Sequence, residues 1–235
     1  MRKLIYLFSI LLFNVSSFTL YSQDQWAYMG GYLSSGGWNS HTGSGNFHPN
    51  NKPSNREHCG SGLYNNQIWI YGGEGGQAGS DIWCYDINQQ AWAFMEDRGA
   101  AENHTDLGVE SAVAHPGNRS RTSMAMDNQG NLWFLGGETQ DLGGHTSWND
   151  LWKYNTSTHR WTWLGGSSTH SDAGSANWPR ARYRARGWFD AQGNYWVFGG
   201  LYSAGASTFY PLNDLWKYTV STNTWTCESG DCNTL

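Results

Sequence analysis

Histidine, cysteine and carboxylate side chains would build a metal or catalytic site, and in this chain they are dispersed. The eight histidines form no His-x-His pair and no His-Glu-x-x-His motif, the spacings typical of zinc sites. The four cysteines, Cys59, Cys84, Cys227 and Cys232, show no Cys-x-x-Cys spacing. No Gly-x-Ser-x-Gly elbow or phosphate-binding glycine loop occurs. We therefore expect no metal, no cofactor and no catalytic residue in this chain.

The elements that carry these side chains repeat three times. A segment ending in Gly-Gly occurs at 67–73, 131–137 and 194–200, and each copy is followed by Asp-x-Trp and then by a closing Trp. An arginine precedes each copy, and these arginines lie 63 residues apart in both intervals. The repeated positions are Arg56, Arg119, Arg182, Gly72, Gly73, Gly136, Gly137, Gly199, Gly200, Trp83, Trp152, Trp216, Trp92, Trp161 and Trp225.

Each copy has the pattern of a four-stranded antiparallel meander. Alternation along 68–71 places successive side chains on opposite faces, and the glycines in 127–131 and 190–194 suit hairpin turns. Because both faces carry large apolar side chains, one sheet must pack against its copies. Radial packing predicts an all-β propeller within residues 24–235, with four-stranded blades at about 56–95, 119–163 and 182–227.

The repeated Arg, the Gly-Gly after an aromatic strand and Asn-Asp-Leu-Trp-Lys-Tyr at 149–154 and 213–218 resemble kelch repeats. The resemblance covers residues 26 to about 230 and is closest to the long bacterial secreted repeats related to the propeller of galactose oxidase. It implies a kelch-type β-propeller. The first copy departs from the pattern, with a shorter turn and with Cys84 where the other copies have Lys. The copper ligands of galactose oxidase cannot be mapped onto this sequence, so the resemblance concerns the scaffold and not the chemistry.

Three blades are few for a closed ring, because propellers have about four to eight blades and the kelch family mostly six or seven. A lone leading segment at 26–31 matches the closing strand at 161–166. We therefore predict an incomplete ring of three blades plus one N-terminal strand. Two explanations stay open: the chain is the N-terminal part of a longer propeller, or two chains pair as a homodimer into a six-bladed ring.

The connections of the predicted blades divide between two faces of the propeller. The turns joining first to second and third to fourth strands share one face and are short, whereas the other connections vary in length and share the opposite face. Loops on a rigid scaffold commonly carry binding residues, through aromatic stacking or through carboxylates that accept hydrogen bonds. The candidate ligand-binding residues are Trp38, Glu74, Glu138, Trp148, Trp178, Tyr202 and Tyr210. The alternative is that the rings cover the loop bases and the carboxylates are merely solvated.

The repeated arginine and the residue two positions after it have separate expected roles. Arg182 and its two equivalents are expected to satisfy loop carbonyls. The residues that follow, which are predicted to line the axial channel, are His58, Arg121 and Arg184. In the channel they would either attract an anion or form hydrogen bonds between blades.

Residues 1–23 have the layout of a secretory signal peptide, with Arg2 and Lys3 before an apolar run at 4–13. That run is about half the length of a membrane span. A secreted or cell-surface location follows, extracellular or periplasmic, in which Cys227 and Cys232 are near enough in sequence to form a disulfide. The net charge of −5 and the absence of a basic patch argue against a nucleic-acid partner, and no amphipathic basic helix suggests membrane insertion.

The expected function is a secreted binding scaffold with a protein or glycan partner. Two alternatives stay open at this point. The chain could be part of a galactose oxidase-like or other enzyme whose catalytic residues lie elsewhere, or a structural repeat of a large surface protein.

Overall fold

The computed structural model describes residues 37–75, 79–141, 144–203 and 208–232, and the regular structure in these ranges is β-strand throughout. The predicted signal peptide at 1–23 and the predicted lone strand at 26–31 lie outside the described residues. Within the described ranges, no helix has the length and apolar character needed to cross a membrane.

The strands form three antiparallel sheets, which we call blades 1, 2 and 3. Blade 1 consists of β1 (Gly60–Tyr64), β2 (Gln67–Tyr71), β3 (Ile82–Asp86) and β4 (Ala91–Glu96). Blade 2 consists of β6 (Ser123–Met126), β7 (Leu132–Asp141), β8 (Gly144–Asn155) and β9 (Arg160–Gly165), with β5 (Glu110–Ser111) at its outer edge. Blade 3 consists of β10 (Arg186–Phe189), β11 (Tyr195–Ser203), β12 (Phe209–Thr219) and β13 (Thr224–Ser229). Consecutive strands are neighbours in each blade, which confirms the predicted meanders.

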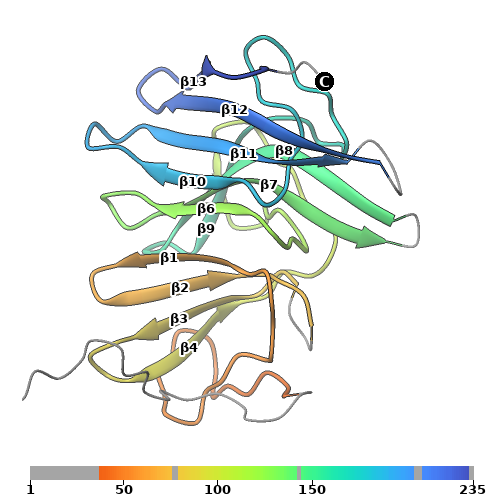
Figure 1. Ribbon diagram of the computed structural model, residues 1–235. Helices are drawn as coiled ribbons and strands as arrows, with labels where there is room; N and C mark the ends of the chain where they lie inside the picture. Colours follow the sequence, from red (N-terminus) through yellow and green to blue (C-terminus); the bar gives the residue numbers. More distant parts are fainter. Residues whose placement is uncertain (1–36, 76–78, 142–143, 204–207, 233–235) are drawn as a thin grey trace, which may run out of the picture.

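The blades are arranged around their first strands. Figure 1 shows β1, β6 and β10 side by side, with the later strands of each blade fanning away from them. A chain of backbone hydrogen bonds joins the segments just before these strands: the N–H of Arg121 donates to the carbonyl of His58, and the N–H of Arg184 to that of Arg121, both at 2.8 Å. All three residues have positive φ angles of 54–60°. The inner strands are therefore linked by main chain as well as by packing.

Aromatic side chains fill the space between adjacent blades. Between blades 1 and 2, the ring of Tyr71 stacks on Phe134 with centroids 5.1 Å apart. Between blades 2 and 3, the ring of Trp133 lies 5.6 Å from Phe189 and 6.0 Å from Tyr218. A buried ring removes about 150–250 Å² from water, so a few rings per blade stabilise the stack. The two core clusters accordingly lie between blades.

A buried arginine–aspartate pair recurs in every blade. The guanidinium of Arg182 donates to both carboxylate oxygens of Asp214, at 2.7 and 2.9 Å, and also to the carbonyls of Arg180 and Gly199. Each aspartate also accepts the indole N–H of the tryptophan two residues later. The equivalent sets are Arg56, Asp81 and Trp83 in blade 1, and Arg119, Asp150 and Trp152 in blade 2. The repeat pattern predicts only carbonyl partners for these arginines, and the aspartate is a finding of the structure.

Steric contacts and hydrogen bonding both explain why a Gly-Gly pair follows each second strand. At Gly137 the φ angle is +98°, and a Cβ atom there would lie 2.8 Å from the carbonyl oxygen of Ser120. The N–H of Gly137 donates to the carbonyl of Arg182 in the next repeat, at 2.9 Å. Gly73 has the same conformation and donates in the same way to the carbonyl of Arg119. A side chain at Gly137 or Gly73 would clash with the segment that leads into the first strand of the same blade.

The connections after Gly137 and Gly200 differ from the long loops expected from the sequence. In blade 2, β7 and β8 continue to pair beyond the glycines as far as Asp141 and Gly144, and in blade 3 β11 and β12 pair as far as Ser203 and Phe209. A register shift at the glycines bends each pair, and Figure 1 shows both as hairpins extending from the blades. Pairing satisfies backbone groups that an irregular loop would expose. We call the described parts of these pairs arm 2 (138–141 and 144–147) and arm 3 (201–203 and 208–212).

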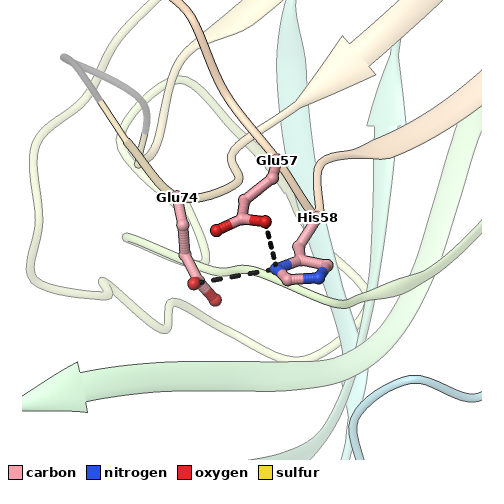
Figure 2. A group of neighbouring side chains, drawn as sticks. All are labelled: Glu57, His58 and Glu74. Carbon is pink, nitrogen blue, oxygen red and sulfur yellow. Dashed lines mark ion pairs between the residues drawn. The ribbon is translucent and has the colours of Figure 1, made fainter. Parts of the chain in front are cut away.

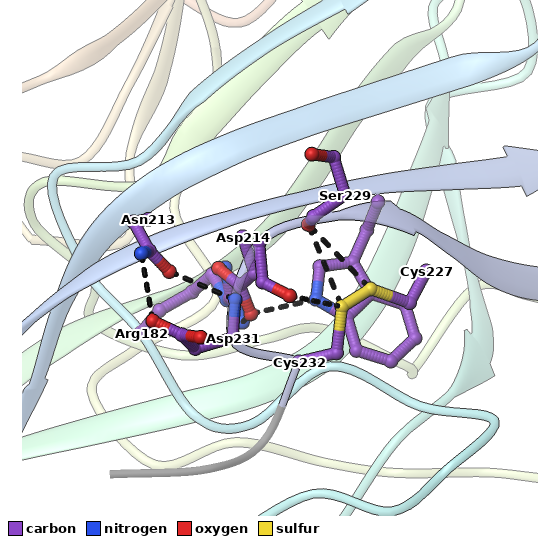
Figure 3. The surroundings of a disulfide bond; sticks show 9 residues. Arg182, Asn213, Asp214, Cys227, Ser229, Asp231 and Cys232 are labelled. Carbon is purple, nitrogen blue, oxygen red and sulfur yellow. Dashed lines mark hydrogen bonds and ion pairs between the residues drawn. A yellow bond between two sulfur atoms is a disulfide. The ribbon is translucent and has the colours of Figure 1, made fainter.

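A disulfide between Cys227 and Cys232 closes a turn at the end of β13 (Figure 3). The side chain of Asn213 holds the same turn, because it donates to the carboxylate of Asp231 at 2.8 Å and accepts the Asp231 N–H at 3.0 Å. Cys59 and Cys84 are free thiols, and Cys84 is buried. The disulfide that the short sequence separation of Cys227 and Cys232 allows is thus present in the structure.

Candidate functional site

Glu74 and Glu138 occupy equivalent positions, each directly after a Gly-Gly pair. The backbone of Glu74 pairs with Glu57 through hydrogen bonds of 2.8 and 2.9 Å, and that of Glu138 pairs with Ser120 at 2.9 and 3.0 Å. These bridges connect the end of each second strand to the segment that leads into the first strand. Both carboxylates therefore lie beside the inner strands, on the face that carries the arms.

One guanidinium, that of Arg121, joins these two carboxylates across the boundary between blades 1 and 2. Its Nη1 lies 2.5 Å from Oε1 of Glu74, and its Nη2 donates to Oε2 at 3.1 Å. Arg121 also forms an ion pair with Glu138, whose side chain is fully buried. The hydroxyl of Ser120 donates to Glu74 at 2.8 Å. Two carboxylates and one guanidinium leave the group one negative charge in excess.

His58 lies next to this group and faces two carboxylates (Figure 2). Its Nδ1 is 3.8 Å from Glu57 and 3.7 Å from Glu74. These three side chains place one ligand atom each within 4.8 Å of the others. We assign no metal to them, because Glu74 is already paired with Arg121 and the Glu57 side chain is 70% exposed.

A polar hollow of about 370 Å³ opens between blades 1 and 2 on the same face. Glu74 and Glu138 lie in its wall, together with Ser120 and Thr139 at the base of arm 2. The remaining lining residues are Gly73, Gly75, Gly79, Ala100, Asn118 and Arg119. The glycines leave backbone groups accessible, so the hollow offers acceptors at carboxylates and carbonyls. It suits a ligand that donates hydrogen bonds or carries positive charge.

A second hollow of about 360 Å³ lies at the inner strands, lined by the predicted channel residues His58, Arg121 and Arg184 with Cys59 and Arg186 among others. The structure thus brings the three predicted residues together and links their backbones. Arg121 is neutralised by its two glutamates, whereas Arg184 is exposed and its guanidinium lies 5.7 Å from the ring of Tyr183. Burial raises the pKa of the Cys59 thiol, which keeps it protonated at neutral pH.

The aromatic residues expected to bind ligand do not form one platform. Trp148 is 3% exposed, and the guanidinium of Arg119 lies 3.8 Å from its ring centroid. Trp178 is half-buried, donates its indole N–H to the carbonyl of Asn149 at 2.8 Å and meets the edge of Trp225. Both rings therefore cover the bases of their own loops, which was the alternative interpretation of the sequence.

The other three rings differ in how far solvent reaches them. Tyr202 is 8% exposed, with Arg180 over its ring at 4.8 Å, and it stacks on Tyr210 with centroids 6.2 Å apart. Tyr210 on arm 3 is 37% exposed, and Trp38 is 64% exposed. Of the five predicted rings, these last two present a large surface to solvent.

Comparison with known proteins identifies the repeat. The Kelch motif family model matches residues 55–97, which include all of blade 1. Kelch domain-containing protein 10 of Homo sapiens and of Bos taurus is 28% identical over 167 residues, which is 69% of this chain and 31% of the relative. The fold is similar to that of YjhT, with a TM-score of 0.52 and 17% identity over 76% of this chain and 53% of that chain. Residues 55–97 thus match a kelch motif, and the chain is similar to kelch proteins.

The likeness to kelch proteins agrees with the strands, the Gly-Gly pairs and the arrangement of the blades as parts of a propeller. The chain spans about a third of the length of the curated kelch relatives it matches. The likeness to YjhT concerns the fold alone, because only 17% of the aligned residues are identical. The function of this chain therefore depends on its own side chains.

The sequence indicates both glutamates but not the guanidinium that joins them. It placed Arg121 in the channel and Glu74 and Glu138 in loops, without pairing them. Ser120 was not selected at all, although it occupies the repeat position of Glu57. A signal was present in the order of residues, since Glu follows Gly-Gly in the two repeats that meet at Arg121. In the third kelch repeat Leu201 takes that position and bridges Tyr183.

Proposed function

We propose that this kelch chain is a protein-interaction scaffold that binds its partner on the face carrying arm 2, arm 3 and the Glu74–Glu138 hollow. The observation that carries the proposal is the gathering of variable elements on one side of a rigid stack. Both arms and the hollow lined by Glu74 and Glu138 lie there. The kelch relatives support a scaffold of this kind.

The chemistry of the hollow favours a partner segment that carries lysine, arginine or hydroxyl side chains. Glu74, Glu138 and Arg121 together hold an excess negative charge, and Glu74 retains a side chain that is 23% exposed. A charge-assisted hydrogen bond contributes about 1.5–3 kcal/mol. The acidic net charge of the chain, −5, attracts the same class of partner at longer range.

A glycan is the second ligand class that we consider, because sugar hydroxyls also donate to carboxylates. Tyr210 is the observation in its favour: it is 37% exposed on arm 3 and is held in place by stacking on Tyr202. We further propose that the chain is exported, on the signal-like layout of residues 1–23. N-terminal sequencing of the protein recovered outside the cytoplasm tests export directly.

A random-peptide phage library tests the binding face. We expect the purified chain to select peptides enriched in lysine and arginine, and Glu74→Gln to weaken their binding about 10- to 100-fold, the equivalent of one charge-assisted hydrogen bond. The matched control is Glu228→Gln, which removes a partly exposed, ion-paired carboxylate from β13 at the opposite end of the stack.

A photo-crosslinking amino acid at Ala100, an exposed residue of the hollow, should capture the selected peptides. The same amino acid at Gln192, in the exposed turn on the other face, should not capture them. Equal binding by Glu74→Gln, or capture only at Gln192, would contradict the proposed site. Selection of sugars on a glycan array with loss in Tyr210→Ala would instead favour the glycan.

A further inference from the structure

A hollow of about 340 Å³ opens between blades 2 and 3, on the face opposite the arms. It lies between the turn that joins β6 to β7 and the turn that joins β10 to β11, which point to the same side in Figure 1. Trp133, Phe189 and Val220 form its apolar part. Of the residues that line it, only Lys153 carries a positive charge, and its ammonium group lies 5.9 Å from the centroid of the Trp133 ring.

A tyrosine ring occupies the corresponding place at the boundary between blades 1 and 2. Tyr64, the last residue of β1, lies against the turn that joins β6 to β7, where a Cβ atom at Gly130 would be 2.6 Å from the Tyr64 ring. Gly130 is buried. Gly193 has the same position in blade 3 and a similar φ angle, +80° against +86°, yet no described atom beyond its chain neighbours lies within 4 Å of a Cβ built there. The turn is therefore covered by a ring in blade 2 and not in blade 3.

The difference between the two boundaries comes from one residue. The pairing of β1 with β2 and of β6 with β7 places Asp127 at the repeat position of Tyr64. The Asp127 carboxylate accepts hydrogen bonds from the N–H groups of Gln129 and Asn131, at 2.9 and 2.8 Å, and from the indole of Trp133 at 2.8 Å. A short side chain held within its own turn cannot cover the turn of blade 3, so the space that Tyr64 fills at the first boundary is open at the second.

The ammonium group of Lys153 has no carboxylate in ion-pair contact among the described residues. The equivalent lysine of blade 3, Lys217, forms an ion pair of 2.6 Å with Glu228. In blade 2 the position of Glu228 is taken by Leu164, which cannot pair. Asp127 also lines the hollow, but the donors of its own turn hold its carboxylate. The hollow therefore combines an apolar part with a cation that can donate to an acidic group.

We propose that this hollow binds a tyrosine side chain of a partner protein, in a segment where an acidic residue is next to that tyrosine. The ring takes the place over Gly193 that Tyr64 takes over Gly130, and the acidic residue accepts a charge-assisted hydrogen bond from Lys153. Aromatic anchors in pockets carry much of the binding energy at protein interfaces. This contact is on the face opposite the arms, and it is independent of the binding face proposed above.

NMR spectroscopy of the isotope-labelled full chain with a synthetic peptide tests the site. The probe is acetyl-Ser-Glu-Tyr-Ser-Gly-amide, titrated to millimolar concentration. We expect saturable shifts of the Trp133 indole N–H and of the Gly193 amide, because both lie at the hollow. The same peptide with alanine in place of tyrosine should leave both resonances unchanged. Glutamine in place of glutamate should raise the Kd about tenfold, since the ammonium group loses its charged acceptor.

Two substitutions in the chain locate the ring. Gln192→Trp fills the hollow with a ring of the chain itself, so the peptide should no longer shift the Trp133 indole. The matched control is Ala191→Trp, an exposed position in the same turn that does not line the hollow, and it should bind as the wild type does.

A double-mutant cycle locates the charge. Lys153→Met keeps most of the side-chain stem and should raise the Kd about tenfold, and replacing the peptide glutamate by glutamine should then have no further effect. Lys217→Met, which removes the ion-paired lysine outside the hollow, should bind as the wild type does. Thermal denaturation checks that each variant is folded.

Three results would each overturn the proposal: no saturable shift in the wild type, equal binding of the alanine peptide, or unchanged binding by Gln192→Trp. An equal effect of the peptide glutamine in the wild type and in Lys153→Met would overturn the part assigned to Lys153. The test of the Glu74–Glu138 hollow uses peptides rich in lysine and arginine, so the two proposals can fail separately.

Discussion

The guanidinium of Arg121 and the carboxylate of Glu74 form an ion pair with Nη1 and Oε1 2.5 Å apart, and the pair joins blade 2 to blade 1. Arg121 also holds Glu138, whose side chain is fully buried. The same residue thus shapes the candidate site and contributes to the boundary between blades. Stability and binding can be separated experimentally by changing Glu74, which is partly exposed, rather than Arg121.

Replacing Arg121 should destabilise the fold strongly. In Arg121→Met the buried Glu138 carboxylate loses its counter-charge, and breaking a buried pair on one side costs about 3–5 kcal/mol. Urea denaturation measures the free energy of unfolding. The control is Arg186→Met, an exposed arginine of the same hollow, for which we expect a change within about 0.5 kcal/mol. Similar small losses in both variants would contradict the assigned role of Arg121.

A methyl group at Gly73 should be far more costly than one at a similar glycine in open space. Gly73 has a φ angle of +104°, and its Cβ would lie 2.7 Å from the carbonyl oxygen of Glu57. Gly193 has a φ angle of +80° with nothing within 4 Å. We expect Gly193→Ala to lose about 1–2 kcal/mol through conformation alone and Gly73→Ala to lose more, because it adds a clash. Thermal denaturation compares the two, and equal losses would show that the close approach has no energetic effect.

Acid should destabilise the buried Arg182–Asp214 pair. Burial alone would raise the pKa of Asp214, but the hydrogen bonds and charge of Arg182 and the Trp216 indole bring it below its ordinary value. A carboxyl with a lowered pKa in the folded state stabilises the fold above its ordinary pKa of about 3.8, and that contribution is lost as the pH falls through the folded value. Unfolding free energy should therefore decline below about pH 4.

The variant Asp214→Asn identifies this carboxyl as one source of that decline. It should be less stable at neutral pH by about 3 kcal/mol, because Arg182 is left without its counter-charge, and should show a shallower loss between pH 4 and pH 2. An unchanged acid slope would mean that other carboxyls determine the acid sensitivity.

The hydrogen bond from Trp196 to Asp190, in the turn before β11, can be tested by NMR spectroscopy. The indole N–H of Trp196 donates to the Asp190 carboxylate at 2.7 Å, and this bond, with others from Asn194 and Gln192, lowers the pKa of Asp190 to about 2. Trp196→Phe removes the donor, so the pKa of Asp190 should rise toward 3.8 in an NMR titration. No change would mean that the backbone donors alone hold the carboxylate ionised.

The propeller blades were predictable from sequence because their causes are local and recur three times. Alternating side chains define the strands, and each Gly-Gly pair marks the bend after the second strand. The kelch resemblance rested on the same residues, and the family match and the strand order confirm it. The partner of each repeated arginine was not predictable in this way, because Asp214 lies 32 residues from Arg182 and meets it only after the sheet has formed.

The sequence by itself determined that three aromatic-rich sheets would form and that each would need a neighbour on either side. The tertiary structure decided which side chains find that neighbour. Trp148 and Phe198 are both large rings, yet one lies under Arg119 and the other faces solvent. Exposure depends on what lies across the boundary between blades, and that is a property of the packed stack, because residues far apart in the chain provide the two sides of each boundary.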